Sequence, residues 1–125
     1  MSTKIETQHT AEFLVSEAPG TLSRDQVTVT VPANTTYQAG TVLAKLSASG
    51  KHVIYDNEGT DGSEAAAAIL YEGAPNDTNA PVDLVRTVIN RFAEVRKADL
   101  VWDDEANDGA AGIVDLLALG IKVRE

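Results

Sequence analysis

The sequence has no cysteine and few aromatic residues, and both shortages narrow what the chain can be. Without cysteine it forms no disulfide and offers no thiolate for catalysis or zinc binding. Aromatic side chains make up 5% of the 125 residues, so a core must consist mainly of Val, Ile, Leu and Ala. The length is sufficient for one domain that buries about two thirds of the surface of its unfolded chain.

Positive charge and long apolar runs are also scarce. The chain has 10 Lys and Arg against 19 Asp and Glu, a net charge of -9. Nucleic-acid-binding proteins usually present a basic face that displaces counterions from phosphates, so we expect neither nucleic acid nor an anionic membrane as partner. No apolar run approaches the roughly 20 residues that span a bilayer, and residues 1–13 lack the basic and apolar regions of a secretory signal. We therefore expect a soluble protein that stays where it is made.

Residues that carry catalysis do not form a recognisable motif. The two histidines, His9 and His52, have no Asp or Glu placed locally to orient them. The glycines do not form GxGxxG after a strand, and no GK[ST] occurs, so a phosphate-cradling loop is not indicated. The chemistry of the residues predicts no enzyme and no cofactor.

Two acidic loops, which begin at Asp56 and Asp103, are the most specific candidates for a metal site, and the metal would be calcium. A calcium loop of the EF-hand type requires glycine at its sixth position and glutamate at its twelfth. In the first loop these positions hold Asp61 and Ala67, and the second loop fails in the same way. We expect solvated turns at both places, and no metal.

The apolar pattern predicts a mainly β domain. In residues 26–31, QVTVTV, valines alternate strictly with polar residues, as in a strand with one buried face. Residues 82–89 and 92–95 are close enough to pair across Asn90 and Arg91. Loops are expected at 32–36 and 71–81. Further strands are predicted at 41–46, 51–55, 65–70 and 121–124.

One short helix is predicted near the C-terminus, over residues 110–119. Ile113, Leu116 and Leu117 recur there at three- and four-residue spacing, and Gly120 stands where a left-handed C-terminal cap is expected. Asn107 or Asp108 would cap its N-terminus.

Residues 1–24 are polar and rich in threonine and serine, so they cannot build a core alone. We interpret them as a flexible N-terminal arm, followed by a single β domain over residues 25–125. The apolar anchors of this arm would be Ile5, Phe13, Leu14 and Val15. In the alternative interpretation, Phe13 to Val15 form an edge strand of the domain.

Trp102 is the single tryptophan, and its role can be interpreted in two ways. It would stack on a sugar or anchor an interface, as amphipathic aromatic side chains do. The only tryptophan of a small domain is more often part of its core, and both interpretations stay open.

Short blocks along the chain carry a further signal through their order and spacing: EFLVSEA at 12–18, AGTVLAK at 39–45, GK at 50–51 with YD at 55–56, TDGS at 60–63, AIL at 68–70, AEV at 93–95, LVW at 100–102 and LALGIKVR at 117–124. Together they resemble the head decoration protein D family of tailed phages. The blocks cover most of the chain from Glu12 onward, although none of them is a catalytic signature.

The resemblance implies a small domain of β-clip type, not an enzyme, that assembles as a homotrimer. Such trimers bind the major capsid protein at three-fold positions on the outside of the expanded head, so the protein would be a structural component of the virion surface. In the family, the N-terminal arm becomes ordered on the major capsid protein. Here the strand at 26–31 follows residues 1–24 at once, which departs from the form of the lambda decoration protein. The alternatives are a β-clip-like module that binds a small ligand or sugar and, more remotely, a small acidic hydrolase.

Overall fold

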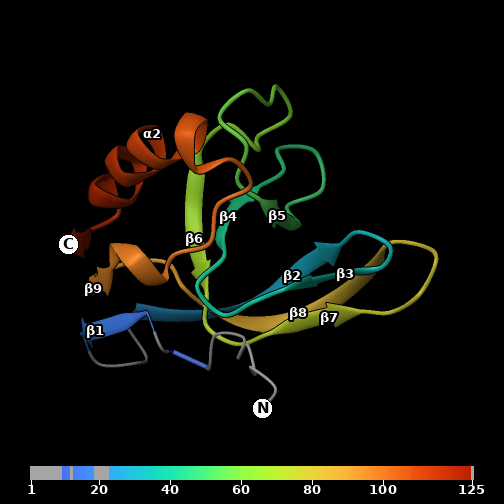
Figure 1. The fold of residues 1–125 in the computed structure, drawn as a ribbon, viewed down its shortest axis with the longest axis horizontal. Helices are drawn as coiled ribbons and strands as arrows, with labels where there is room; N and C mark the ends of the chain where they lie inside the picture. The colour runs from blue at the N-terminus through green and yellow to red at the C-terminus, as the bar shows by residue number, and fades with distance from the viewer. Residues whose placement is uncertain (1–9, 12, 19–22, 125) are drawn as a thin grey trace, which may run out of the picture.

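The computed structural model describes residues 10–11, 13–18 and 23–124, without the side chains of residues 105–107 (Figure 1). These ranges contain the following elements in chain order: β1 (Leu14–Glu17), β2 (Arg24–Val31), β3 (Thr35–Tyr37), β4 (Val42–Lys45), β5 (His52–Ile54), β6 (Ala66–Leu70), β7 (Ala74–Asn76), β8 (Val82–Ile89), β9 (Ala93–Arg96), the 3-10 helix η1 (Lys97–Asp99), α2 (Glu105–Ala118) and β10 (Ile121–Arg124).

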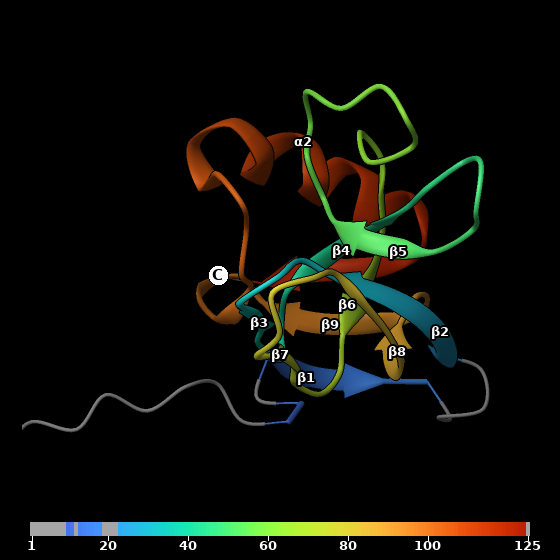
Figure 2. The ribbon, with the colours of Figure 1, turned by 90° about the vertical axis from the view of Figure 1, so that its right-hand side faces the viewer.

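The strands form one barrel and two smaller sheets. The barrel closes in the order β2-β5-β4-β6-β8, a second sheet has the order β1-β9-β10, and β3 pairs with β7. Figure 1 shows α2 and β9 on one side of β6 and the β3–β7 pair on the other, and Figure 2 shows β9 between α2 and β1. The mainly β class with a single C-terminal α-helix is therefore confirmed for the described ranges. The assignment to the β-clip type stays a prediction.

Strands β4 and β6, together with the last two residues of β8, are buried on both faces and separate two apolar cores. On β4, Val42 and Ala44 face one core and Leu43 faces the other, because successive side chains of a strand point to opposite sides. This double burial explains why β4 and β6 contain continuous apolar runs. The barrel core contains Val29, Val31, Tyr37, Leu43, Ala68, Leu70, Ala74 and Val88.

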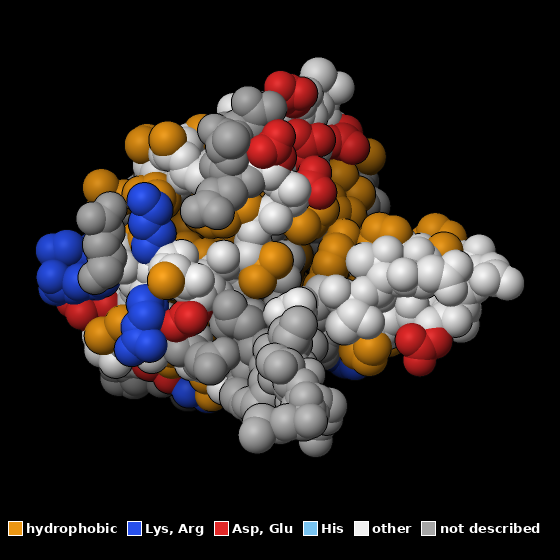
Figure 3. All heavy atoms as spheres, viewed as in Figure 1, with side chains coloured by type: hydrophobic (Ala, Val, Ile, Leu, Met, Phe, Trp, Pro, Cys, Tyr) orange, Lys and Arg blue, Asp and Glu red, His pale blue; other side chains and the backbone are white. Residues whose placement is uncertain are grey.

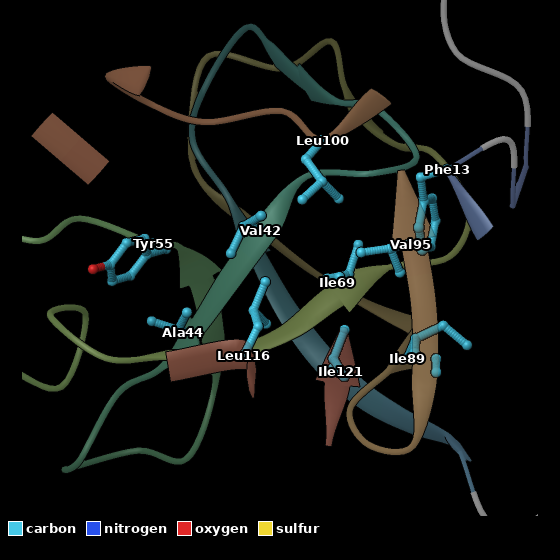
Figure 4. Packing of buried hydrophobic residues seen from close by; sticks show 12 residues of the cluster. Phe13, Val42, Ala44, Tyr55, Ile69, Ile89, Val95, Leu100, Leu116 and Ile121 are labelled. Carbon is cyan, nitrogen blue, oxygen red and sulfur yellow. The ribbon is translucent and has the colours of Figure 1, made fainter. Parts of the chain in front are cut away.

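The second core fills the space between this wall, α2 and the β1-β9-β10 sheet. Figure 4 shows its side chains converging from all of these elements. Leu116 comes from α2, Ile121 from β10 and Val95 from β9, and each is fully buried. No helix in the described part of the chain is both long and apolar enough to cross a membrane.

The strands predicted from alternation and apolar runs are present, and two further strands occur where loops were expected. β3 lies in the predicted loop at 32–36 and extends one residue beyond it, and β7 lies in the loop at 71–81. Their pairing is supported by Asn76, whose buried side-chain amide donates to the carbonyls of Val31 at 3.0 Å and Pro32 at 2.9 Å. This contact joins segments more than 40 residues apart, so no local pattern signals it.

The predicted hairpin between residues 82–89 and 92–95 is wrong. β9 pairs with β1 in the antiparallel sense and with β10 in the parallel sense, so both of its edges are occupied. Phe92, which precedes β9, has a φ of 51° in the left-handed region. This turn directs the chain out of the barrel sheet and into the second sheet.

The C-terminal helix is longer than predicted and begins earlier. It starts at Glu105 with Asp104 as N-cap, not at Asn107 or Asp108. The carboxylate of Asp108 instead accepts hydrogen bonds from the backbone N–H groups of Asp104 at 3.1 Å and Asn57 at 3.0 Å. The predicted left-handed cap at Gly120 is confirmed by its φ of 81°.

A side chain at Gly112 would disrupt the contact between α2 and the second core. A Cβ at this position would overlap the Trp102 ring and lie 3.1 Å from the Tyr55 ring. We expect Gly112→Ala to destabilise the protein by about 1 to 3 kcal/mol through overpacking, which exceeds the roughly 1 kcal/mol that alanine adds to helix propensity. Denaturant unfolding and near-UV circular dichroism measure the effect. Gly73→Ala is the control, because a Cβ there meets only the Tyr37 carbonyl oxygen at 3.9 Å. Equal stability of the two variants would contradict the prediction.

Candidate interaction surfaces

The predicted anchors of the N-terminal arm differ strongly in exposure. Phe13 is fully buried in the second core, beside Val95 in Figure 4, and Leu14 packs against the same core. Val15 is 48% exposed. Ile5 lies outside the described residues. Of the two interpretations of Phe13 to Val15, the structure shows the edge strand, because β1 begins at Leu14 and pairs with β9. An arm over the residues before it, and a domain boundary after residue 24, stay predictions.

β1 is attached to the beginning of β2 by an ion pair. The guanidinium of Arg24 contacts both carboxylate oxygens of Glu17, and its Cζ atom lies over the ring of Tyr71, 4.4 Å from the ring centroid. The Ser23 hydroxyl donates to the same carboxylate at 2.6 Å. Hydrogen bonding from Arg24 is the main reason that the pKa of Glu17 lies below its ordinary value. These contacts fix the C-terminal end of β1.

One edge of β1 is open with respect to the described residues. Among the described strands, β1 pairs only with β9, and it forms the margin of its sheet. The side chain of Val15 is exposed on this strand. An unpaired edge offers backbone N–H and C=O groups to an added strand, which makes β1 a candidate docking edge.

Trp102 lies against the second core. Its ring meets Tyr55 edge-on, with centroids 6.2 Å apart and planes at 68°. The tryptophan is only partly buried. The structure thus gives Trp102 a packing role, and a role in an interface stays a prediction.

Positive and negative side chains occupy different parts of the surface. Half of the ten Lys and Arg residues lie between residues 91 and 124. In Figure 3 the Lys and Arg side chains gather at the left, around β9, and Asp and Glu side chains gather at the top, over the loop between β5 and β6. The net negative charge of the chain is therefore unevenly distributed.

The acidic loop between β5 and β6 uses its carboxylates to bind its own backbone. Asp56 accepts from the Glu58 N–H at 3.0 Å, and Asp61 accepts from the Ser63 N–H at 3.2 Å as well as from the Ser63 hydroxyl at 2.6 Å. The hydrogen bond from Ser63 holds the pKa of Asp61 below its ordinary value. The described residues contain no group of three or more His, Cys, Asp or Glu arranged to hold a metal ion.

A groove opens where β2 and β5 separate. The two strands are paired only at Val29 and His52, and Pro32, just after β2, has no N–H to continue a ladder. The groove has a volume of about 350 Å³, and a second hollow of about 330 Å³ adjoins it. Residues from several segments line it, among them Pro32, Tyr37, Leu46, Ile54, Asp61 and Asp103. No pattern in the sequence indicates this groove, because no motif links any two of its segments.

His52 is a buried titratable residue at the seam between β2 and β5. It is 7% exposed, and its Nδ1 atom has no hydrogen-bond partner among the described residues. Burial is the main cause, and the nearby charge of Lys45 the second, of a pKa below the ordinary value of 6.5. The folded protein therefore favours the neutral imidazole.

The model of one protein family matches residues 3–121 of the chain, and its description is bacteriophage lambda head decoration protein D. No curated protein matches the chain.

Protonation of His52 should destabilise the protein as the pH falls. Well above pH 6.5 the imidazole is neutral in both the folded and the unfolded chain, so it does not change the free energy of unfolding. As the pH falls below 6.5, the unfolded chain binds a proton at this imidazole before the folded chain does, which favours unfolding. We expect the free energy of unfolding to decrease between pH 6.5 and pH 5, and to decrease less in His52→Asn. Urea unfolding at a series of pH values measures this difference, with His9→Asn as the control for the other histidine. Parallel pH profiles for His52→Asn and the unmodified protein would refute the assignment.

Proposed function

Because the chain belongs to the bacteriophage lambda head decoration protein D family, we propose that it cements the phage head as a trimer. Trimers bind the major capsid protein on the outside of the expanded head, at three-fold sites, and stabilise the shell against the packaged genome. The observation that carries this proposal is the extent of the family match, which runs from residue 3 to residue 121 and so includes the N-terminal residues as well as the folded domain.

The N-terminal residues and β1 are the proposed contact with the shell. Ile5 lies in the polar segment before β1, and Val15 exposes an apolar side chain on the open edge. Leu14 and the buried Phe13 support this contact from within, because they attach β1 to the core. A strand of the capsid protein that adds to β1 gains backbone hydrogen bonds without a sequence-specific pocket.

Trimerisation makes a weak single contact sufficient. Ordering a chain segment costs about 1 to 2 kcal/mol per residue in backbone entropy, so one N-terminal segment binds weakly by itself. Once the first of three segments has bound, the other two are held at high effective concentration near their sites. A trimer that binds only the expanded lattice stabilises that lattice by mass action.

The open edge of β1 supplies a test with a matched control. We expect Val15→Glu to weaken binding to expanded, undecorated heads about tenfold or more, because a charge on an edge strand opposes pairing with a further strand. Val85→Glu is the control, since Val85 is also an exposed strand valine, at 61%, but lies on β8. Co-sedimentation with the heads measures binding, and survival of the heads on heating measures stabilisation.

A shortened chain tests the N-terminal segment separately. Removing residues 1–9 keeps Phe13 and β1, whereas removing residues 1–24 would also delete part of the core. The shortened protein should remain folded by circular dichroism and lose most of its binding. If the full chain does not bind heads at all, the proposed function fails. If the full chain, the shortened chain and Val15→Glu bind equally, the decoration role stands and the contact lies elsewhere.

A further inference from the structure

An apolar ridge projects from the surface at the C-terminal end of α2. Val114 is 68% exposed, Leu117 is 62% exposed and Phe92 is 51% exposed. Val114 and Leu117 are three residues apart on the helix and therefore lie on one side of it. The Phe92 N–H donates to the carbonyl of Leu119, which joins the turn before β9 to the end of the helix. These three side chains are called the Phe92 ridge below.

The backbone holds Phe92 in this exposed position. Phe92 has a φ of 51°, and such left-handed geometry is uncommon for a bulky residue. Its ring lies over Gly120, where a Cβ would come within 2.8 Å of the Phe92 Cδ1 atom. A strained backbone and a missing Cβ thus combine to present an aromatic ring to solvent. Such strain is typical of sites that serve a function.

The groove between β2 and β5 combines apolar and acidic residues, which makes it complementary to the ridge in polarity and in charge. Its base is apolar, with Leu46 and Ile54 among its lining residues, and apolar side chains are visible in the notch at the right of Figure 3. Its remaining lining includes Asp56, Asp61 and Asp103. Within the described ranges, none of these three carboxylates forms an ion pair with Lys or Arg.

Basic side chains accompany the ridge. Arg91 directly precedes Phe92, and Lys122 is exposed two residues after Gly120. Arg91 shares its charge with Asp25 at 3.6 Å but remains 37% exposed. An apolar ridge flanked by cations and an apolar groove flanked by anions are complementary partners.

We infer that copies of this chain associate head to tail, with the Phe92 ridge of one copy in the groove of the next. This inference rests on the proposed trimer. A closed ring of three requires two different surfaces on each copy, because an interface that pairs a surface with itself gives a dimer. The ridge and the groove are two such surfaces on one chain. The aromatic ring is the central contact, and the charges set its orientation.

Two substitutions separate the two halves of this contact. Phe92→Glu places a charge in the ridge, and Leu46→Glu places one in the groove; each should raise the concentration needed for assembly about 30-fold or more. An equimolar mixture should form dimers but no trimers, because the intact groove of the first variant accepts the intact ridge of the second. Sedimentation velocity measures assembly, and circular dichroism checks folding. Val85→Glu, which lies outside both surfaces, should assemble like the unmodified protein.

The absence of native cysteine allows a direct test that tolerates modest loss of stability. Phe92→Cys and Leu46→Cys, mixed and oxidised with diamide in solution and on expanded heads, should yield a disulfide-linked dimer. The chain with both substitutions should yield a covalent trimer. Val85→Cys mixed with Leu46→Cys is the control and should yield neither.

Each contrary result has a distinct meaning. Trimers that persist in both glutamate variants, or no disulfide between the two cysteine variants in either setting, would overturn the head-to-tail contact while leaving decoration intact. A Phe92→Glu variant that stays trimeric but no longer binds heads would assign the ridge to the shell, and would also overturn the inference. Failure of the unmodified protein to bind heads would refute the proposed function alone, since disulfide trapping in solution reports on association without the shell.

Discussion

The double burial of β4 and β6, continued by Val88 and Ile89 at the end of β8, is the constraint on which the rest of this structure depends. Because these strands separate two cores, every neighbouring element packs against a wall that cannot shift without disturbing both sides. α2 and the β1-β9-β10 sheet cover one face, and β2 with the β3–β7 pair covers the other. With only 5% aromatic residues, the protein achieves this with small and branched aliphatic side chains, which allow strands to approach closely.

This wall also positions the surfaces that bear on function. β1 is held in place by Phe13 in the second core and by the ion pair between Glu17 and Arg24, so its open edge is presented by a rigid base. The groove exists because β5 remains paired with β4 while β2 leaves it after one bridge. The Phe92 ridge exists because the chain leaves the barrel after β8 and enters the second sheet through the left-handed turn at Phe92. The groove and the ridge are thus both produced where the chain departs from a barrel strand pair.

The charges of this protein are unevenly distributed over its surface. Asp56 and Asp61 accept hydrogen bonds from local backbone N–H groups, which shapes the acidic loop. Both also line the groove with Asp103, and none of the three has a cationic partner within the described ranges. Basic side chains gather around β9, away from this loop. An exposed ion pair contributes little to the stability of a protein. A surface on which acidic and basic side chains lie apart, however, favours one orientation of a charged partner over others.

The sequence by itself determined the mainly β class, the strands at 82–89 and 121–124, the helix with its Gly120 cap and, through the order of its blocks, the family. These features follow from local periodicity, from turn residues and from resemblance. It did not determine the β3–β7 pair, the partners of β9 or the start of α2, because Asn76 and Asp108 act through contacts with distant backbone. Only the tertiary structure decided that Phe13 is buried while Val15 is exposed, and that Leu46, Ile54 and Asp103 share one groove. The physical reason is that strand pairing and shared burial join residues whose separation in the sequence carries no periodic signal.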